Sequence, residues 1–532
     1  MTFNLSLREK IGQLITVRTT GYIFDHQIRY PAWEANNQQL EQWLSELNLG
    51  GVILLGGSCA EIAYRTQQLQ QWAKTPLLIS ADIEEGVGQR FTGASWFPPP
   101  MALAEIAKTN ISLAQEYAYK MGEITAQEAL AIGINWILAP VVDINNNPDN
   151  PVINVRAFGD NPQVVSQLTT AFIKGTQNYP VMNTAKHFPG HGDTSTDSHL
   201  DLPRINHDIK RLEALELKPF QEAIRAKVDG IMTAHLLVEA FDKDNPATLS
   251  YPILTGQLRT KMGFEGLIVT DALIMGGVAK YAPPEEIPVK ALQAGADMLL
   301  MPENPEVAIN SIVKAVEWGD LPLSRIDESF NRVSELKKLK GISRAIEQRP
   351  INLYRQIGLN SSRNLVKDIL QQSSDFHGTV TKLKENEGIN LMVVDDLLNC
   401  DFLDRQTPAV TIPHTCGYQL QLFDQRNLYL WKKWEKNRPL ILQVFVRGNP
   451  FKGIAGLSGN AQEIYQEIIN SQQLQGMMIY GSPYVMEWFK KYLPEHTPYG
   501  FSYGQMPDAQ EVMCKQLFQL LREFDMDKGN FL

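Results

Sequence analysis

Short apolar segments alternate with longer amphipathic stretches over roughly the first 300 residues of the chain. Each apolar segment suits one buried strand, and the stretches between them repeat apolar residues with the period of a helix. Such predicted helices lie at 60–74, 111–132, 161–178, 208–227 and 304–317. This alternation predicts parallel βα units, and about eight of them most simply close into a (β/α)8 barrel. An open, doubly wound sheet is the less favoured alternative. The segments lie near residues 12–18, 50–55, 76–82, 134–140, 181–187, 229–235, 266–271 and 297–302.

The alternation weakens after residue 345 and resumes near residue 389. We therefore predict a barrel domain at 1–345, a linker at 346–388, and a smaller α/β domain with a mainly parallel sheet at 389–532. The predicted strands and helices of this second domain lie at 389–394, 439–446 and 474–481, and at 461–472, 483–492 and 508–524.

Composition excludes several classes of protein. The formal net charge is -10, without the clustered Lys and Arg that nucleic-acid binding needs. The four cysteines are scattered, so neither a disulfide framework nor a zinc knuckle is indicated. The N-terminal residues lack the apolar core of a signal peptide, and no later segment has membrane-spanning length. We expect a cytoplasmic protein that binds neither nucleic acid nor membrane, and the sequence indicates no oligomeric state.

Polar residues end several of the predicted strands. In a barrel, the carboxyl ends of the strands meet at one face, where active sites are built. Acids and bases from separate strands would therefore converge there. These strand-end residues are Asp82, Asp143, Lys186, His187, His235 and Asp271.

The densest group of titratable residues is KHFPGHGDTSTDSHLDLP at residues 186–203. Its glycines and prolines predict a loop, and its acids and imidazoles indicate a catalytic or metal-binding role. A metal site is less favoured, because Pro189 and Gly190 interrupt the helical spacing that paired zinc-binding histidines use. For His191 and His207 we favour a structural role, which is to hold the loop. Residues 188–200 of this segment have little apolar surface, so we expect them to be mobile and to close over the site when a ligand binds.

The same string resembles the signature of glycoside hydrolase family 3, in its bacterial β-N-acetylglucosaminidase branch. The resemblance extends over about residues 5–340, and in that family this region is a (β/α)8 barrel. The C-terminal part resembles the α/β domain of two-domain members. Supporting matches are ADIEEGVGQRF (81–91), INWILAPVVDINNNPDNPVINVRAFG (134–159), LKPFQEAI (217–224), DGIMTAHL (229–236), GFEGLIVTDALIM (263–275) and AGADMLLMP (294–302).

The resemblance implies a role for each matching residue. Asp271 would be the nucleophile that forms a glycosyl ester, and His199 with Asp197 would be the acid/base. An imidazole titrates near neutral pH, and a carboxylate beside it orients the ring. No cofactor and no metal is implied. Residues that match the sugar-binding motifs are Asp82, Arg90, Arg156, Lys186 and His187.

The implied activity is retaining hydrolysis of terminal, non-reducing β-linked N-acetylglucosamine, with peptidoglycan fragments as the expected substrate. A β-glucosidase, a phosphorolytic relative and an inactive sugar-binding protein remain alternatives. The chain also departs from the family pattern. The family's D-x-E-G-G-R-V-x-R reads D-I-E-E-G-V-G-Q-R here, so Glu85 replaces a glycine and Val87 an arginine, and Ala157 replaces a small polar residue.

Overall fold

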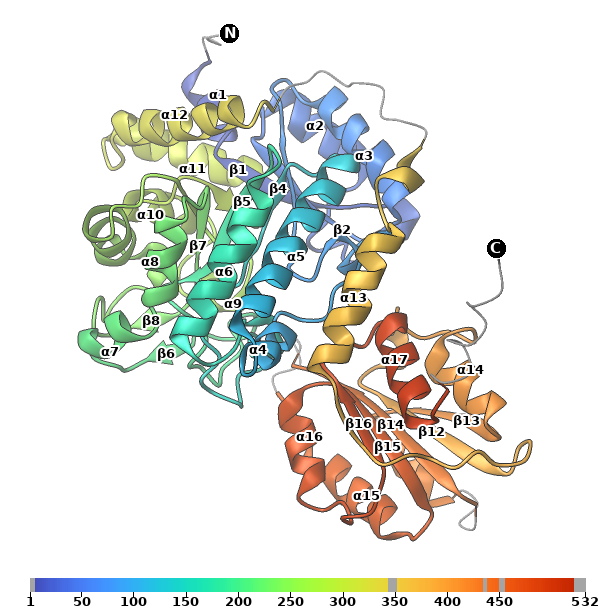
Figure 1. Ribbon diagram of the computed structural model, residues 1–532. Coiled ribbons are helices and arrows are strands. Elements are labelled where there is room, and N and C mark those ends of the chain that lie inside the picture. Colours follow the sequence, from blue (N-terminus) through green and yellow to red (C-terminus); the bar gives the residue numbers. More distant parts are fainter. Residues whose placement is uncertain (1–4, 343–351, 434–437, 449–454, 521–532) are drawn as a thin grey trace.

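The computed structural model describes residues 5–342, 352–433, 438–448 and 455–520. Two bodies are visible in Figure 1. The larger, coloured blue to yellow, is a barrel surrounded by helices, and the smaller, coloured orange to red, is a sheet with helices on both faces. Helix α13 (Asn360–Ser373) runs from one body to the other.

Eight parallel strands of the described chain form the barrel, in the order β10-β1-β2-β3-β4-β5-β7-β9. An isolated bridge between Val269 and Met298 joins β9 to β10 and completes the ring. This closure confirms the predicted barrel over the open sheet. The strands are β1 (Ile15–Thr20), β2 (Gly51–Leu55), β3 (Leu78–Ala81), β4 (Trp136–Ile137), β5 (Met182–Phe188), β7 (Gly230–Thr233), β9 (Leu267–Val269) and β10 (Leu299–Leu300).

The first strand begins three residues later than predicted. The segment 12–18 was assigned to a strand, but Gly12 ends helix α1 (Leu7–Gly12) and β1 starts at Ile15. Ser6 caps α1 through a reciprocal capping box with Glu9, which stabilises a helix at this position. Local capping therefore overrides the apolar run.

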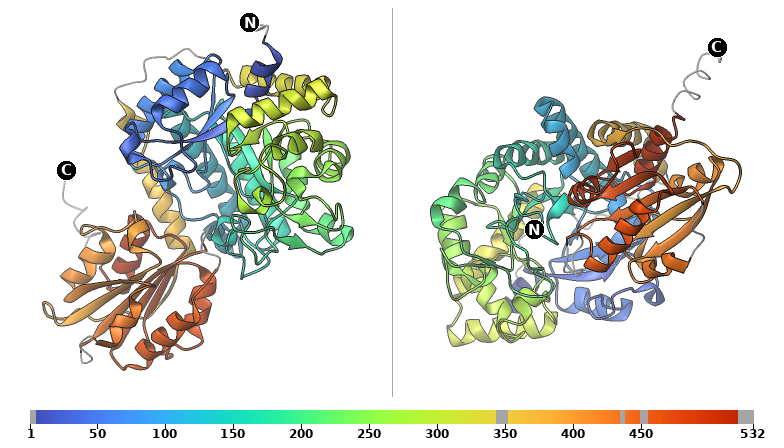
Figure 2. Two further views of the ribbon diagram at one scale, coloured as in Figure 1. Left: turned by 180° about the vertical axis from the view of Figure 1, so that it is seen from behind. Right: turned by 90° about the horizontal axis from the view of Figure 1, so that it is seen from below.

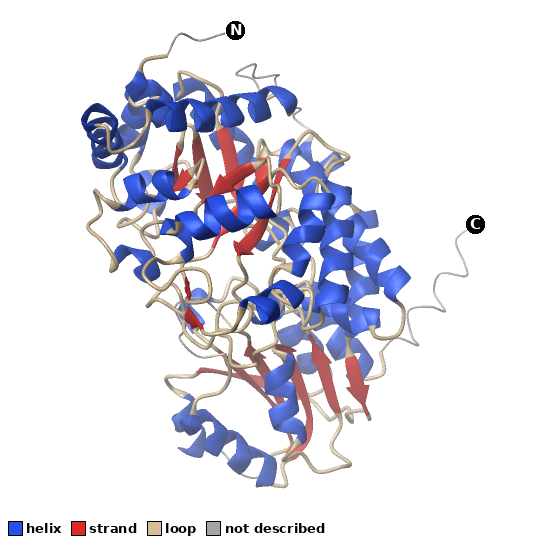
Figure 3. Cartoon of the chain, turned by 90° about the vertical axis from the view of Figure 1, so that its left-hand side faces the viewer, coloured by secondary structure: helices blue, strands red, loops and turns tan. Residues whose placement is uncertain are grey.

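Helices cover the outside of the barrel, as the view from the side shows (Figure 3). The predicted helix at 208–227 is divided into two, because Pro219 has no N–H to donate and begins a new helix in its first turn. A π-helix at Pro252–Lys261 also lies on the outside. The helices are α2 (Asn37–Glu46), α3 (Cys59–Trp72), α4 (Met101–Ala107), α5 (Ile111–Ala131), α6 (Pro162–Thr176), α7 (Ile209–Ala214), α8 (Lys218–Arg225), α9 (Gly276–Ala279), α10 (Ile287–Ala294), α11 (Pro305–Trp318) and α12 (Leu323–Leu339).

The second sheet is mainly parallel, as predicted, in the order β11-β16-β15-β14-β12-β13, and its edge strand β11 runs antiparallel to β16. Its three central strands were predicted, because every residue of β12 and β14 is buried. The edge strand β13 was not predicted, since several of its residues are exposed and it carries no apolar run. The elements are β11 (Asp375–His377), β12 (Gly388–Val394), β13 (Tyr418–Asp424), β14 (Leu440–Val446), β15 (Leu474–Gly481), β16 (Tyr499–Ser502), α14 (Pro408–Thr415), α15 (Gly459–Asn470), α16 (Pro483–Lys490) and α17 (Pro507–Leu517).

The segment 346–388, which we predicted as a linker, is structured in most of its described part. Helix α13 packs against α4 and α5 of the barrel domain and against α17 of the second domain. Strand β11 pairs antiparallel with β16, so the second domain begins before residue 389. The polar composition of this segment reflects the one-sided exposure of a surface helix rather than a loose tether.

Two further features bear on the expected cellular setting. The four cysteines are free, and three of them are buried. Within the described residues, every helix is too short or too polar to cross a membrane.

Lys337 of α12 provides a test of the barrel's packing. Its side chain is buried, and Nζ donates to Oε1 of Gln13 (2.8 Å) and to the carbonyl of Pro76 (2.7 Å), neither of which is charged. Burial lowers the pKa of Lys337 to about 7. Between pH 7 and 10 the unfolded lysine holds a proton that the folded one lacks, so its contribution to stability rises with pH.

We expect the free energy of unfolding of the wild type to rise relative to Lys337→Met by about 1.4 kcal/mol per pH unit in this range. Urea unfolding of the barrel at pH 7 and pH 9 in both proteins measures it. An unchanged difference between the two proteins would show that Lys337 is charged in the fold.

Candidate active site

The strand ends converge on one pocket of about 740 Å3, at the face where the two bodies meet. The view from below shows the second domain beside this face of the barrel (Figure 2). Asp197 lies behind His199 rather than in the pocket wall. The predicted site residues that line the pocket are Asp82, Arg90, Arg156, Lys186, His187, His199 and Asp271.

Asp271 follows β9 at the bottom of this pocket. Burial alone would raise the pKa of its carboxyl. The neighbouring His235, His187 and His199 have the larger combined effect in the other direction, so the pKa falls to about 2. One carboxylate oxygen also accepts from the N–H of Ala272 at 2.7 Å. The carboxylate is therefore ionised at neutral pH, as an attacking group must be.

His235, just after β7, interacts electrostatically with this carboxylate and is completely buried. Its Nε2 must carry the proton, because it contacts the carbonyl of Ala272 at 2.9 Å and a carbonyl only accepts. Burial lowers the pKa of His235. The imidazole is neutral and both of its nitrogens are hydrogen bonded, so it holds the segment that carries Asp271 in place.

Asp197 and His199 form a hydrogen-bonded pair although they are only two residues apart. Oδ1 of Asp197 accepts from both the backbone N–H and Nδ1 of His199, at 2.9 Å each. This local turn places Nδ1–H toward the carboxylate and leaves Nε2 directed away from it. Since His199 lines the pocket, Nε2 is the atom able to exchange a proton there.

A buried ion network lines the opposite wall of the pocket. Nζ of Lys186 contacts Oδ1 of Asp82 at 2.6 Å and Oε2 of Glu84 at 3.9 Å, and Nε of Arg156 donates to Oε1 of Glu84 at 2.8 Å. Burial opposes ionisation of Glu84, but Lys186, Arg156 and Arg90 together lower its pKa. Arg90 is exposed at the rim, where its Nε donates to the carbonyl of Asp82. Such paired, oriented groups can bind several hydroxyls of one sugar.

Asp143, six residues after the end of β4, contacts two histidines. It accepts from the backbone N–H and Nδ1 of His187, the latter at 2.7 Å, and from the backbone N–H of His191 at 2.7 Å. Burial would raise the pKa of Asp143, but the two histidines lower it. Because Nδ1 of His187 donates to Asp143, its Nε2 is left to face the pocket.

The loop at 188–200, predicted to be mobile, is seated over the pocket in this structure. The carbonyls of Ser198 and His199 accept from the N–H groups of Gly277 (3.0 Å) and Gly276 (3.1 Å). A Cβ on either glycine would lie 2.9 Å from one of these oxygens, so the contact requires glycine there. The predicted opening of the loop remains a prediction.

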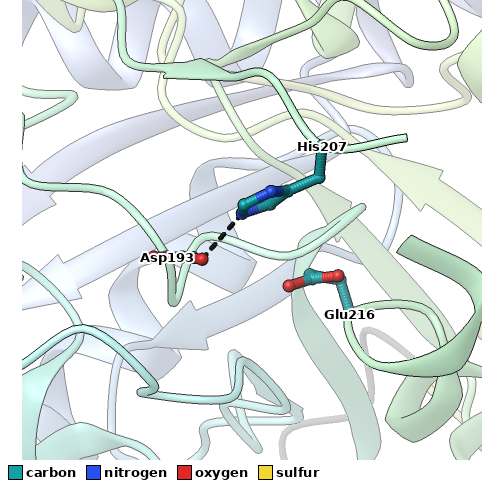
Figure 4. A group of neighbouring side chains, drawn as sticks. All are labelled: Asp193, His207 and Glu216. Atoms are coloured by element: carbon teal, nitrogen blue, oxygen red, sulfur yellow. Dashed lines mark hydrogen bonds and ion pairs between the residues drawn. The ribbon is translucent and has the colours of Figure 1, made fainter. Parts of the chain in front are cut away.

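Within the described residues, one group of acids and histidines could hold a metal ion: Asp193, His207 and Glu216 (Figure 4). It shares only Asp193 with the residues that the sequence offered as metal ligands, which are His187, His191, Asp193, Asp197 and His199. Asp193 accepts from Nε2 of His207 at 2.7 Å, and Arg211 contacts both carboxylates, at 3.4 and 3.1 Å. The Arg211 guanidinium thus supplies the positive charge that a metal ion would otherwise provide, and the group is better described as an anchor for the loop.

The second domain also contributes to the pocket, through Arg447 at the end of β14. Its guanidinium contacts the carboxylate of Glu85 with both terminal nitrogens, at 2.7 and 3.3 Å. Glu85 is fully buried and also accepts from the indole of Trp96. The residue that departs from the family pattern, Glu85, therefore forms an ion pair that joins the two domains beside the pocket. The next residue is a glycine, as its φ of 87° favours.

Breaking this pair is expected to destabilise the junction between the domains. Glu85→Ala leaves the half-buried Arg447 guanidinium without its partner, which costs about 3 kcal/mol. Thermal unfolding of Glu85→Ala, Arg447→Ala and the double variant measures this effect. We expect the double variant to be no less stable than either single variant. Tyr503→Phe is the matched control, since Tyr503 donates to Glu105 across the same junction but outside the pocket. Additive losses would show that the two residues act independently.

Five residues that shape the site were not among the predicted site residues. His235 was recognised as a strand-end residue but was given no role. Asp143 was recognised as a strand-end acid, and Glu84 stands two residues after Asp82, but neither was given a role. Glu85 was noted only as a departure. Nothing in the sequence pairs Glu85 with Arg447, because 362 positions separate them.

The fold and the pocket define an α/β-barrel protein with ionised carboxylates and histidines gathered at its strand ends. The chain belongs to glycosyl hydrolase family 3. Residues 6–336 match the glycosyl hydrolase family 3 N-terminal domain, and residues 381–519 match the bacterial glycosyl hydrolase family 3 C-terminal domain. The second match also begins before residue 389.

Similar proteins carry related names. The chain is 36% identical over 330 residues to β-hexosaminidase A of Pseudoalteromonas piscicida, which covers 56% of this chain and 55% of that protein. It is 39% identical over 265 residues to a β-hexosaminidase of Tolumonas auensis, covering 49% and 78%. The chain thus spans about half the length of the first of these relatives. A family 3 β-N-acetylglucosaminidase from Paenibacillus sp. FPU-7 has a similar structure, with a TM-score of 0.80 and 28% identity over 97% of both chains.

Proposed function

We propose that this chain is a retaining exo-β-N-acetylglucosaminidase. The observation that carries the proposal is the pairing of two groups in one pocket. The Asp271 carboxylate is kept ionised, and His199 presents Nε2 while Asp197 holds Nδ1. These are the nucleophile and the acid/base that a two-step displacement needs. The names of the similar proteins support N-acetylglucosamine as the sugar.

In the first step, an oxygen of Asp271 attacks the anomeric carbon and forms a glycosyl ester. The bond to the glycosidic oxygen breaks, and that oxygen takes the proton from Nε2 of His199. In the second step, Nε2 takes a proton from water, whose oxygen attacks the same carbon and releases Asp271. Asp197 stabilises the imidazolium in both steps. Two inversions retain the β configuration.

The polar network on the opposite wall would bind the terminal sugar. Lys186 and Arg156 are oriented by buried carboxylates, and His187 by Asp143, so their free donors and acceptors are fixed before the sugar arrives. The loop and the second domain border the pocket, which favours a chain end over the middle of a polymer. Peptidoglycan fragments in the cytosol are the substrate we propose.

Turnover of a chromogenic β-N-acetylglucosaminide, compared with the matching β-glucoside, tests the proposal. We expect a clear preference for the first, with β-N-acetylglucosamine as the initial product by NMR. Addition of phosphate distinguishes phosphorolysis, which yields N-acetylglucosamine 1-phosphate; a histidine acid/base would tolerate an anionic acceptor. An initial α product, or sugar binding without turnover, would contradict the proposal.

A further inference from the structure

His191 lies inside the loop and is almost completely buried, with 1% of its surface exposed. Both ring nitrogens are hydrogen bonded to hydroxyls of the same loop: Nδ1 to Oγ1 of Thr194 at 2.9 Å and Nε2 to Oγ of Ser198 at 2.8 Å. Its backbone N–H donates to Asp143. His191 therefore connects two parts of the site: its backbone N–H bonds Asp143, and its ring bonds Ser198 near the far end of the loop.

Ser198 stands between Asp197 and His199 in the chain. Its side chain is buried against His191, and its carbonyl accepts from the N–H of Gly277. Ser198 is thus held from both sides, by the His191 ring and by the segment that follows Asp271. A rotation of Ser198 would turn the neighbouring Asp197–His199 pair, because the three residues form one tight turn.

The ring is neutral in this setting. Burial lowers the pKa of His191 to about 4, although Asp143 acts in the opposite direction. A neutral imidazole has one donor and one acceptor. The hydroxyl of Thr194 donates to the carbonyl of His191, so it can accept from Nδ1–H. Nε2 is then the acceptor for the Ser198 hydroxyl.

We propose that His191 is a positioning residue for the acid/base, which fixes Ser198 and through it the direction of the Asp197–His199 pair above Asp271. This inference rests on the proposed function. His191 exchanges no proton with the substrate; it determines where Nε2 of His199 points. We predicted only a structural role for His191 from the sequence, and the structure adds the connection to Ser198.

The test compares leaving groups, because a misplaced acid matters most when the leaving group is poor. The variants are His191→Phe, His191→Gln and Ser198→Ala, and kcat/KM is measured with an activated aryl N-acetylglucosaminide and with N,N'-diacetylchitobiose. We expect His191→Phe and Ser198→Ala to lose about tenfold more activity on the disaccharide than on the aryl glycoside. His191→Gln offers both a donor and an acceptor and should recover part of that loss.

His207→Gln is the matched control, since His207 anchors the same loop through Asp193 without touching Ser198. A general loosening of the loop should lower both rates equally in this variant. Equal losses on both substrates in Ser198→Ala, or in a folded His191→Phe, would overturn the inference. His199→Ala distinguishes failure of this inference from failure of the proposed function. If His199→Ala also loses equal activity on both substrates, His199 is not the acid/base, and the error is not merely in how it is positioned.

Discussion

Asp271→Ala is expected to abolish turnover while the fold is retained. The substitution removes the group that we propose attacks the anomeric carbon, and a loss of more than about 1,000-fold, or roughly 4 kcal/mol of barrier, should follow. The fold should survive because, among the described residues, the Asp271 side chain accepts one hydrogen bond, a local one from the N–H of Ala272. Thermal unfolding and sugar binding provide the controls for folding.

Addition of azide tests specifically whether Asp271 is the nucleophile. Azide can enter the space left by the carboxylate and attack an activated aryl β-N-acetylglucosaminide from the face that Asp271 occupied. One inversion then gives the α-glycosyl azide. Activity within about tenfold of the wild type would exclude Asp271 as nucleophile, since the remaining barrier would be too low. It would point instead to attack by the substrate's own acetamido group.

His199→Ala is expected to act differently on different substrates. Protonation of the leaving oxygen is the step that the imidazole assists, so turnover of N,N'-diacetylchitobiose should fall by about 100-fold or more. An aryl glycoside with a good leaving group needs little protonation and should still form the glycosyl ester. That ester should accumulate, because water then lacks its base.

Azide again distinguishes the role, since it needs no base and attacks the glycosyl ester from the other face. The product should be the β-glycosyl azide, the opposite anomer from that of Asp271→Ala. Asp197→Asn, which keeps the geometry but removes the charge beside Nδ1, should show the same pattern more weakly. Equal losses on both substrates, without the azide product, would assign His199 to the loop's structure.

Much of the barrel follows from local information. Its strands are buried on both sides, so most of them appear as short apolar runs, and the polar residues that follow such a run lie at the carboxyl end of a strand. Strand β5 is an exception, because it contains Lys186 and His187. The relation between apolar run and strand end alone predicted that six residues would meet at one face: Asp82, Asp143, Lys186, His187, His235 and Asp271. Four of them line one pocket, whereas Asp143 and His235 are buried outside its lining and bond His187 and the carbonyl of Ala272, respectively. The roles of the four pocket residues were implied by the resemblance and remain to be tested by the experiments above.

Errors occurred where a short-range signal competed with the apolar pattern. A capping box turned residues 7–12 into a helix, and Pro219 divided a predicted helix into two. In the second domain the edge strands escaped recognition, because β11 and β13 are partly exposed and lack an apolar run. The same exposure made the segment 346–388 resemble a linker.

Neighbouring residues are enough to predict the barrel and the loop after β5, because burial and turn chemistry are local properties. The loop was predicted to begin at residue 186, but β5 extends to Phe188. Which charges are paired is visible only in the folded chain. Glu85 looked like an unexplained departure until Arg447, from the other domain, was found beside it. Likewise, His191 looked like a simple loop residue until its ring was found on Ser198. Pairing depends on distances in space, and a hydrogen bond between residues far apart in the chain leaves no periodic trace in a single sequence.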